Sequence, residues 1–260
     1  MSKIIAIANQ KGGVGKTTTT MNLGAALAAR GERVLLLDFD PQCSLTICCG
    51  IEAHQLENSV YNALIGRPVS ATLDSITITT DEVNISLVPS GIDLARADME
   101  LAAELMREGF LKRAIDNMEV DYDFILIDCP PSLGILTTNA LVAADELLIP
   151  VEADYLAFKA MQLLLQTTFP RVREQINKKL QLAGILVTKY QSRTTHSKEI
   201  MEAIRQAHPN KVFTSVISAG TRLRDASAAG RSLLAYEPKS PQSEEYRGLA
   251  EEIAVHAEAN

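Results

Sequence analysis

A segment rich in glycine, lysine and threonine, residues 9–20 (NQKGGVGKTTTT), has the residue types that bind nucleotide phosphates. Glycines let the backbone pass close to an anion. Lys16 supplies a positive charge for the β- and γ-phosphates, and Thr17 supplies a hydroxyl for Mg²⁺. The apolar run at residues 3–8 predicts a buried strand before the segment, and residues 21–30 predict a helix after it. The segment is therefore expected at a strand-to-helix turn, where the first free N–H groups of a helix face an anion.

The segment departs from the usual phosphate-loop pattern at its start. A glycine normally stands five residues before Gly15, but here that position is Gln10, and Lys11 follows it. A lysine at the mouth of the loop is not needed to hold a nucleotide within one chain. We predict that the nucleotide is bound by Lys11, Gly12, Gly13, Val14, Gly15, Lys16, Thr17 and Thr18. The alternative is a chance turn rich in glycine and lysine.

Two aspartates follow the next strand expected along the chain, residues 32–38 (ERVLLLD). One residue separates Asp38 from Asp40, so an extended backbone places both on the same side. Ligands gather at the carboxyl ends of the strands in an open parallel sheet. One carboxylate could hold the water shell of a metal ion, and the other could orient an attacking water. The alternative is a solvated turn that leads into Pro41.

A third aspartate, Asp128, ends the clearest strand in the chain, residues 122–128 (YDFILID). Downstream of a phosphate loop, an aspartate at this place is typical of a side chain that faces Mg²⁺ through a water. The paired prolines Pro130 and Pro131 stiffen the loop that follows, where it would pass the γ-phosphate. The candidate metal-site residues are Thr17, Asp38, Asp40 and Asp128.

The composition is that of an ordinary globular protein: 260 residues, 47% hydrophobic and 22% charged, with a net charge of −7. The net charge does not indicate a strongly basic nucleic-acid binder, although a local basic patch remains compatible with it. No apolar stretch is long enough to span a bilayer, and no signal peptide precedes the first strand. The cysteines lack the spacing of zinc ligands, so we expect reduced thiols in a cytoplasmic protein; they are Cys43, Cys48, Cys49 and Cys129.

Strand and helix patterns alternate along the rest of the chain. Further strands are expected at residues 76–80, 85–89, 146–151, 182–188 and 212–217. Helices are expected at residues 57–66, from near Ile92 through 118 with Ser90 as the N-cap and an interruption at Gly109, at 156–178 with a kink or break at Pro170, at 197–207 and at 241–257. No linker or repeat interrupts the pattern. It predicts one α/β domain over residues 1–260, with a doubly wound, mostly parallel sheet flanked by helices.

Basic residues concentrate late in the chain, between residues 189 and 231. They are Lys189, Arg193, Lys198, Arg205, Lys211, Arg222, Arg224 and Arg231. Fewer acidic residues lie in this range, so the segment could present a local face that binds the phosphates of a nucleic acid. The alternative is scattered charge that serves solubility.

The three motifs together resemble the ParA/MinD family of P-loop ATPases. KGGVGKT at residues 11–17 is similar to the deviant Walker A motif of that family, LLLDFDPQ at residues 35–42 to its second motif, and DCPPSLG at residues 128–134 to its DxPPSLG segment. The resemblance implies ATP and Mg²⁺ as cofactors. It implies that Lys11 reaches the phosphates bound to the partner subunit of an ATP-bound homodimer. It also implies that Asp40 aligns the hydrolytic water, that Asp38 is a neighbouring metal-site carboxylate and that Asp128 holds the metal shell.

The resemblance extends to the late basic segment. ParA-type members bind duplex DNA non-specifically through arginines in two places, which Arg193 and Arg222 match, and Arg224 is an added base. The family's Pro, Arg and Asn at the start of the second place are Ser218, Ala219 and Gly220 here. One DNA-binding arginine of the family is therefore missing, and adenine contacts from this loop do not carry over.

The resemblance is closest to the short ParA/Soj type, which has no separate N-terminal DNA-reading domain. It implies a cytoplasmic, nucleoid-associated ATPase that partitions a plasmid, chromosome or mobile element with a ParB-like activator. Hydrolysis is expected to be slow without that partner, because no intrinsic arginine finger or strong base is visible. Two alternatives are a MinD-like regulator or a positioner of a protein cargo. The acidic tail at residues 251–258 argues against membrane binding, and no cluster-binding cysteine motif supports a redox ATPase like the nitrogenase iron protein.

Overall fold

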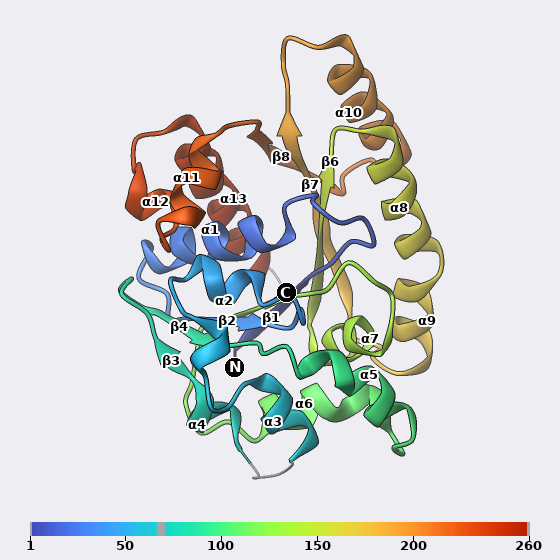
Figure 1. Ribbon diagram of the computed structural model, residues 1–260. Helices are drawn as coiled ribbons and strands as arrows, with labels where there is room; N and C mark the ends of the chain where they lie inside the picture. Colours follow the sequence, from blue (N-terminus) through green and yellow to red (C-terminus); the bar gives the residue numbers. More distant parts are fainter. Residues whose placement is uncertain (1, 67–70, 259–260) are drawn as a thin grey trace.

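The computed structural model describes residues 2–66 and 71–258, and its centre is an eight-stranded sheet in the order β3-β4-β2-β5-β1-β6-β7-β8 (Figure 1). The strands are β1 (Lys3–Ile7), β2 (Val34–Asp38), β3 (Ile78–Thr79), β4 (Ile85–Val88), β5 (Phe124–Asp128), β6 (Glu146–Glu152), β7 (Gln181–Tyr190) and β8 (Val212–Ser218). Among the described residues, only β3 runs antiparallel to its neighbour, and the other paired strands are parallel. The predicted fold class, α/β with a mostly parallel sheet, is confirmed.

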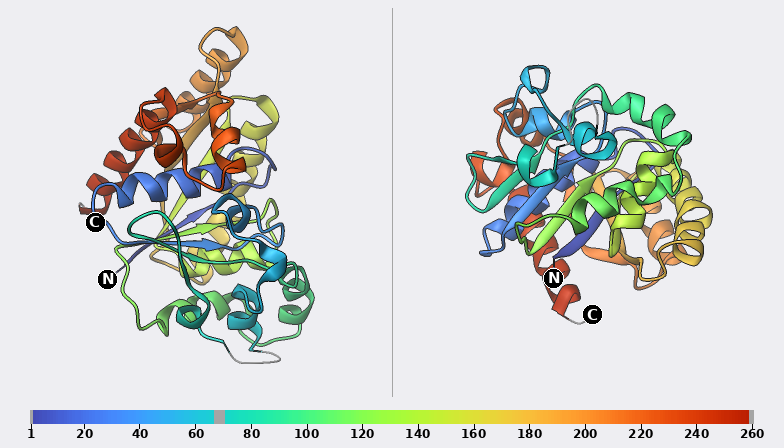
Figure 2. Two further views of the ribbon diagram at one scale, coloured as in Figure 1. Left: turned by 60° about the vertical axis from the view of Figure 1, so that its left-hand side comes forward. Right: turned by 90° about the horizontal axis from the view of Figure 1, so that it is seen from below.

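Helices cover both faces of the sheet (Figure 2). One face carries α1 (Lys16–Ala28), α2 (Ser44–Cys48), α11 (Arg222–Ala228), α12 (Leu233–Tyr236) and α13 (Pro241–Glu258). The other face carries α3 (Val60–Ile65), α4 (Leu73–Ile76), α5 (Leu94–Ala102), α6 (Phe110–Asp116), α7 (Ile135–Ala143), α8 (Tyr155–Gln166), α9 (Thr168–Gln175) and α10 (Thr195–Ala207). Two short 3₁₀ turns lie at Ala53–Gln55 and Arg107–Gly109.

The central strands divide their side chains between two hydrophobic cores. In β1, Ile5 and Ile7 belong to the core under α1 and α13, whereas Ala6 belongs to the core under α5 and α7. Successive side chains of a strand point to opposite faces, so a continuous apolar run is what a strand buried on both faces requires. Helix α1 lies so close to the sheet that a Cβ at Gly24 would meet Leu36 Cδ2 at 2.6 Å.

The strand order places the loop after β1 in the middle of the sheet. Strand β1 has β5 on one side and β6 on the other, and β2 lies beyond β5. The register pairs Ile7 with Asp128 and Asp38 with Asp128, so the carboxyl ends of β1, β2 and β5 are level. The three motifs found in the sequence therefore meet at one edge, as ligand-binding residues do in open α/β sheets.

Several elements differ from the sequence prediction. The helix expected through residue 118 is interrupted at Gly109 as predicted, but the break is wider: α5 ends at Ala102, and α6 begins at Phe110 after a 3₁₀ turn. The helix expected at residues 156–178 is divided at Thr167, and Pro170 stands in the first turn of α9, where its missing N–H costs nothing. Helix α7 was not predicted because most of its side chains are buried, which leaves no amphipathic period to detect.

The C-terminal helix α13 covers the free edge of the sheet with carboxylates. Glu252 accepts hydrogen bonds from the N–H groups of Thr214 and Ser215, both at 2.8 Å, and Glu245 accepts one from Ser218 N–H at 2.8 Å. An uncovered edge strand offers unpaired N–H groups to other chains. These two glutamates therefore provide acceptors for N–H groups of the edge strand β8.

Candidate functional site

The loop between β1 and α1 forms the centre of the site. Gly13 and Gly15 adopt positive φ angles of 74° and 92°, in the left-handed region that favours glycine. Gly15 is also the N-cap of α1, so the helix begins at Lys16, five residues earlier than predicted. The buried Thr188 hydroxyl, near the end of β7, donates to Val14 O at 2.7 Å. This hydrogen bond ties the loop to β7. This arrangement directs the first N–H groups of α1 into the loop, as anion binding requires.

Lys16 lies inside this loop with only 7% of its surface exposed. Its ammonium group is 3.4 Å from the carbonyl oxygen of Lys11, within the loop itself. Burial lowers the pKa of Lys16, and the Asp128 carboxylate opposes that shift. A cation shielded from water attracts an anion more strongly than an exposed one, so the loop is suited to a charged phosphate.

Thr17 and Asp128 meet beside the loop. The Thr17 hydroxyl donates to Asp128 Oδ2 at 2.7 Å, and Asp128 is fully buried. Among the described residues, Asp128 Oδ1 has no hydrogen-bond partner. Burial, and then the nearby Asp38 carboxylate, raise the pKa of Asp128 well above its usual range. A buried carboxylate oxygen without a donor, next to a hydroxyl, is a donor set that fits Mg²⁺ and its water shell.

Asp38 and Asp40 have different surroundings. Asp38 is fully buried: its Oδ2 accepts hydrogen bonds from Thr46 N and Thr46 Oγ1 at 2.8 and 2.6 Å, and its Oδ1 accepts one from Asp40 N at 3.2 Å. Burial raises its pKa to about 6. Asp40 is 8% exposed and accepts a hydrogen bond from Gln42 N at 2.9 Å through one oxygen. Asp38 thus organises the loop that carries Asp40.

Ser90 joins this loop from the end of β4, which corrects its predicted role as a helix N-cap. Its hydroxyl donates to Asp40 O at 2.8 Å, and its N–H donates to Thr46 Oγ1 at 3.0 Å. The N-cap of α5 is Asp93 instead. Sequence position alone did not reveal this contact because Ser90 and Asp40 are 50 residues apart.

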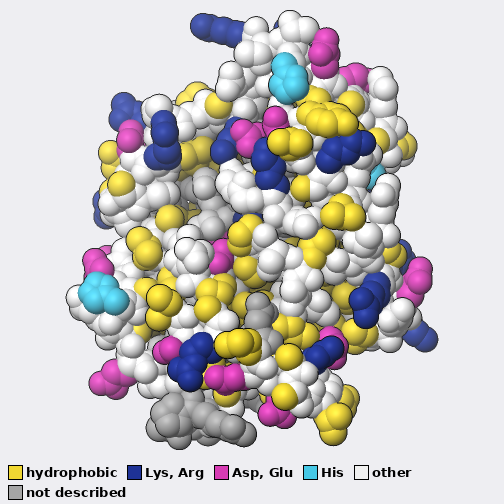
Figure 3. Space-filling model, turned by 45° about the vertical axis from the view of Figure 1, so that its right-hand side comes forward, with side chains coloured by type: hydrophobic (Ala, Val, Ile, Leu, Met, Phe, Trp, Pro, Cys, Tyr) yellow, Lys and Arg dark blue, Asp and Glu magenta, His cyan; other side chains and the backbone are white. Residues whose placement is uncertain are grey.

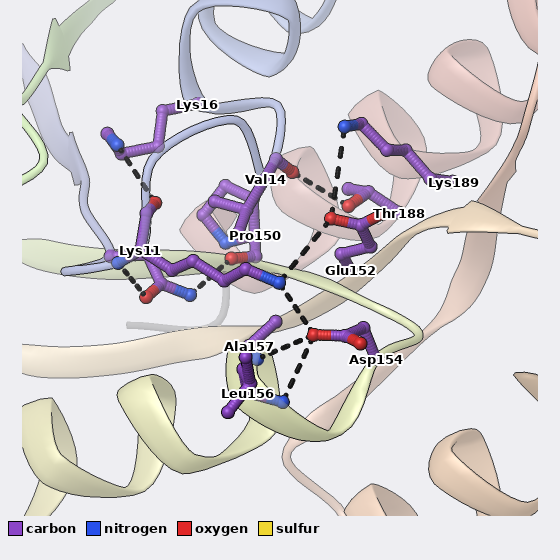
Figure 4. Close-up of polar contacts among 11 residues, drawn as sticks. Lys11, Val14, Lys16, Pro150, Glu152, Asp154, Leu156, Ala157, Thr188 and Lys189 are labelled. Carbon is purple, nitrogen blue, oxygen red and sulfur yellow. Dashed lines mark hydrogen bonds and ion pairs between the residues drawn. The ribbon is translucent and has the colours of Figure 1, made fainter.

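Lys11 points away from Lys16 and toward the end of β6 (Figure 4). Its ammonium group lies 2.6 Å from Asp154 Oδ1 and 3.8 Å from Glu152 Oε2. Glu152 is also 3.8 Å from the ammonium group of Lys189. The Lys11 ammonium holds the pKa of Asp154 below its usual range. Neither carboxylate was singled out from the sequence, because the expected strand ended at residue 151 and both residues read as the lead into the next helix.

A cleft of about 520 Å³ opens beside the loop. Its lining includes Gly15, Thr18, Lys189, Ser218, Arg224 and Tyr246. The structure therefore places Thr18 and Arg224 along one cavity, although the sequence assigned them to different ligands.

The two late basic segments follow neighbouring strands. Arg193 follows β7, Arg222 and Arg224 follow β8, and a hydrogen bond of 3.0 Å from Ala219 N to Tyr190 O joins the two loops. All three arginines are exposed. Arg222 forms ion pairs with Asp225 at 3.6 Å and Glu237 at 3.2 Å. Within the described ranges, Arg193 and Arg224 have no ion pair. In Figure 3, Lys and Arg side chains of the upper half are interspersed with acidic ones.

Polar residues that the sequence analysis missed support nearly every part of the site. Asn9 donates through Nδ2 to Pro150 O at 2.8 Å, and its Oδ1 accepts from Lys11 N at 3.1 Å. The other missed residues are Thr46, Glu152, Asp154 and Thr188, described above. Except for Thr46, which lies in α2, they share a position at or near the carboxyl end of a strand.

Comparisons with known proteins agree with this geometry. A family model described as an AAA domain matches residues 2–182. The chain is 43% identical to the sporulation initiation inhibitor protein Soj of Bacillus subtilis strain 168, over 98% of this chain and 100% of that protein. It is 41% identical to the chromosome-partitioning ATPase Soj of Treponema pallidum strain Nichols, over 98% of both chains.

Solved structures with the same fold hold nucleotide and magnesium. Cobyrinic acid a,c-diamide synthase from Mycobacterium smegmatis, with bound ADP and magnesium, superposes with a TM-score of 0.87 at 36% identity, over 100% of this chain and 96% of that one. The septum site-determining protein MinD from Pyrococcus horikoshii OT3, complexed with Mg-ADP, gives 0.80 at 26% identity, over 99% and 98%. No helix in the described residues is long and apolar enough to span a membrane.

Proposed function

Because the chain belongs to the ParA/Soj type of the ParA/MinD family of P-loop ATPases, we propose that it hydrolyses ATP with Mg²⁺, dimerises in the ATP state and then binds duplex DNA non-specifically. In the cell this cycle partitions a DNA cargo with a ParB-like activator on the nucleoid. The observation that carries the proposal is the Thr17–Asp128 contact beside a glycine loop, with one buried oxygen of Asp128 left without a partner.

Different residues at the loop bind different parts of the Mg²⁺-nucleotide complex. The N–H groups at the start of α1 and the Lys16 ammonium hold the β- and γ-phosphates, since both lie at the same end of the helix. Thr17 and Asp128 hold Mg²⁺ and its waters, and this ion neutralises charge that develops on the phosphates. Asp38 keeps the Asp40 loop in place through its three hydrogen bonds.

Asp40 is the residue best placed to orient the attacking water. It is nearly buried, and Gln42 N occupies only one of its oxygens. The stiff loop at Pro130 and Pro131 lies against the phosphate loop, because a Cβ at Gly12 would be 3.9 Å from Pro131 Cβ. This segment directly follows Asp128, so we expect it to be the first to change position when the γ-phosphate is lost.

The DNA-binding part of the proposal has support from the pairing of the two basic loops. Arg193 and Arg224 are exposed and without ion pairs in the described part of the chain, so both are available to backbone phosphates. Phosphate contacts of this kind release counterions and depend strongly on salt. Arg222 contributes less because it already contacts two carboxylates.

The test is duplex-DNA binding by the purified chain with ATP, with ADP and without nucleotide, at low and moderate salt. We expect binding only with ATP, weaker at the higher salt, and absent in Lys16→Ala. Lys178→Ala, which removes an exposed lysine far from the loop, is the matched control and keeps the binding. ATP-driven dimers that bind no DNA even at low salt would overturn the DNA-binding claim and favour a protein cargo.

A further inference from the structure

Lys11 is engaged in its own chain by two carboxylates at the end of β6. The ammonium group is 2.6 Å from Asp154 Oδ1 and 3.8 Å from Glu152 Oε2, and Figure 4 shows the side chain extended toward both. The three side chains are 28%, 36% and 30% exposed, so water reaches them. An ion pair with this exposure is weak enough to exchange for a stronger partner.

The backbone of Lys11 is fixed while its side chain is not. Asn9 accepts a hydrogen bond from Lys11 N at 3.1 Å and is itself anchored to Pro150 O at 2.8 Å. The Lys16 ammonium contacts Lys11 O at 3.4 Å. The ammonium group of Lys11 can therefore be redirected by rotating side-chain bonds alone, without remodelling the loop.

Both carboxylates keep partners when Lys11 leaves. Asp154 is the N-cap of α8, and its Oδ1 also accepts hydrogen bonds from Leu156 N and Ala157 N at 3.0 and 3.2 Å. Glu152 retains Lys189 at 3.8 Å. Departure of Lys11 thus leaves no buried charge uncompensated, which distinguishes this contact from a structural ion pair whose loss is costly.

We propose that Asp154, assisted by Glu152, holds Lys11 in a latched position within one chain and thereby sets the ATP concentration at which dimers form. The latch rests on the proposed ATP-driven dimerisation, in which Lys11 must turn to phosphates on the other subunit. Asp154 and Glu152 are positioning residues in this view, because they act on the nucleotide only through Lys11.

Asp154→Asn separates the latch from the helix cap. Asparagine caps helices about as well as aspartate, so α8 is preserved while the charge is removed. Asp116→Asn is the matched control, because it removes an ion pair of the same 2.6 Å length, to Lys112, on the remote helix α6. Asp154→Ala loses both cap and charge, so the difference between its melting temperature and that of Asp154→Asn measures the effect of losing the cap.

Two measurements test the latch. In the nucleotide-free chain, the rate of Lys11 acetylation, read by peptide mass spectrometry, should rise severalfold in Asp154→Asn. With a non-hydrolysable ATP analogue, analytical ultracentrifugation should give half-maximal dimer at an analogue concentration about threefold to tenfold lower, since each dimer breaks two such exposed ion pairs. Asp116→Asn should match the wild type in both measurements.

Unchanged acetylation in Asp154→Asn would overturn the latch whatever the dimerisation result. Faster acetylation with an unchanged dimerisation threshold would overturn the regulatory role. A wild-type chain that stays monomeric at saturating analogue would overturn the proposed dimerisation, and the threshold with it, while the acetylation rates would still show whether Asp154 holds Lys11.

Discussion

The carboxyl ends of β1, β2 and β5 and those of β7 and β8 lie along one edge of the same sheet but differ in burial. At the first set, Asp38 and Asp128 are fully buried and Lys16 is 7% exposed. At the second set, the arginines are exposed, and Arg222 is already paired with two carboxylates. In the first region, burial fixes the charged groups in place. In the second, the net positive charge depends on which arginines are paired with carboxylates.

This difference affects how each region tolerates change. Buried polar groups need partners, so their residue types and spacing are tightly constrained. Exposed arginines are held by few contacts, so a chain can exchange them with little effect on stability. The departures at Ser218, Ala219 and Gly220 lie in the second region, and the phosphate loop retains the full Lys-Gly-Gly pattern.

The largest effect is expected from Asp128→Asn, which should lower ATP hydrolysis by roughly a hundredfold to a thousandfold. The same substitution should raise the melting temperature of the nucleotide-free chain, because it removes a charge that burial and Asp38 disfavour. Steady-state phosphate release and thermal unfolding check both parts. If Asp128→Asn still hydrolysed ATP at the wild-type rate, the buried site would tolerate substitution as the exposed surface does, and the proposed difference between the two regions would be wrong.

A smaller effect is expected on DNA binding. Arg193→Ala and Arg224→Ala should each weaken ATP-dependent binding about tenfold at low salt and reduce the salt slope by about one. Arg222→Ala should weaken it less, because Asp225 and Glu237 already neutralise that guanidinium. Fluorescence anisotropy over a salt series measures all three variants.

Equal losses in the three arginine variants would show that the ion pairs of Arg222 open on DNA. If Arg224→Ala instead weakens nucleotide binding and leaves the salt slope unchanged, this arginine acts in the cleft that it lines.

Thr188→Val should destabilise the chain by about 1–2 kcal/mol, because it leaves the buried Val14 carbonyl without its donor. Thr167→Val is the matched control: it removes a threonine-to-carbonyl bond of 2.6 Å that is exposed, so water replaces the donor. Urea unfolding of both variants measures the difference. If both variants lost the same free energy of unfolding, the buried Thr188–Val14 hydrogen bond would stabilise the chain no more than the exposed one.

The smallest effect concerns Glu245 beside β8. Burial raises the pKa of this carboxyl group above its usual value, so the folded chain binds the proton more tightly than the unfolded chain. Its contribution to stability should therefore decline as pH rises from about 4.5 through the raised pKa, and Glu245→Gln should flatten that decline. Urea unfolding of the wild type and of Glu245→Gln at several pH values measures this difference in the decline of stability. A steeper decline in Glu245→Gln would contradict the assignment.

Most of the fold was predictable from the sequence because parallel strands such as β2, β5 and β6 are buried almost throughout, and such strands read as continuous apolar runs. The prediction missed α7, whose sides are almost all buried. It anticipated the break between α5 and α6 at Gly109, and it placed the break between α8 and α9 at Pro170 instead of Thr167. Ser90 was placed by local capping rules, although its actual partner is 50 residues away.

The sequence by itself determined the phosphate loop, the aspartates at the strand ends and the family, because each depends on residue types within one short segment. Only the tertiary structure decided which carboxylate oxygen is free, which arginine is already paired and where Lys11 points. Those properties arise from contacts between segments far apart in the chain, such as Lys11 with Asp154, 143 residues away. Pairwise distances of that kind are set by how the strands are ordered in the sheet, and no local pattern encodes them.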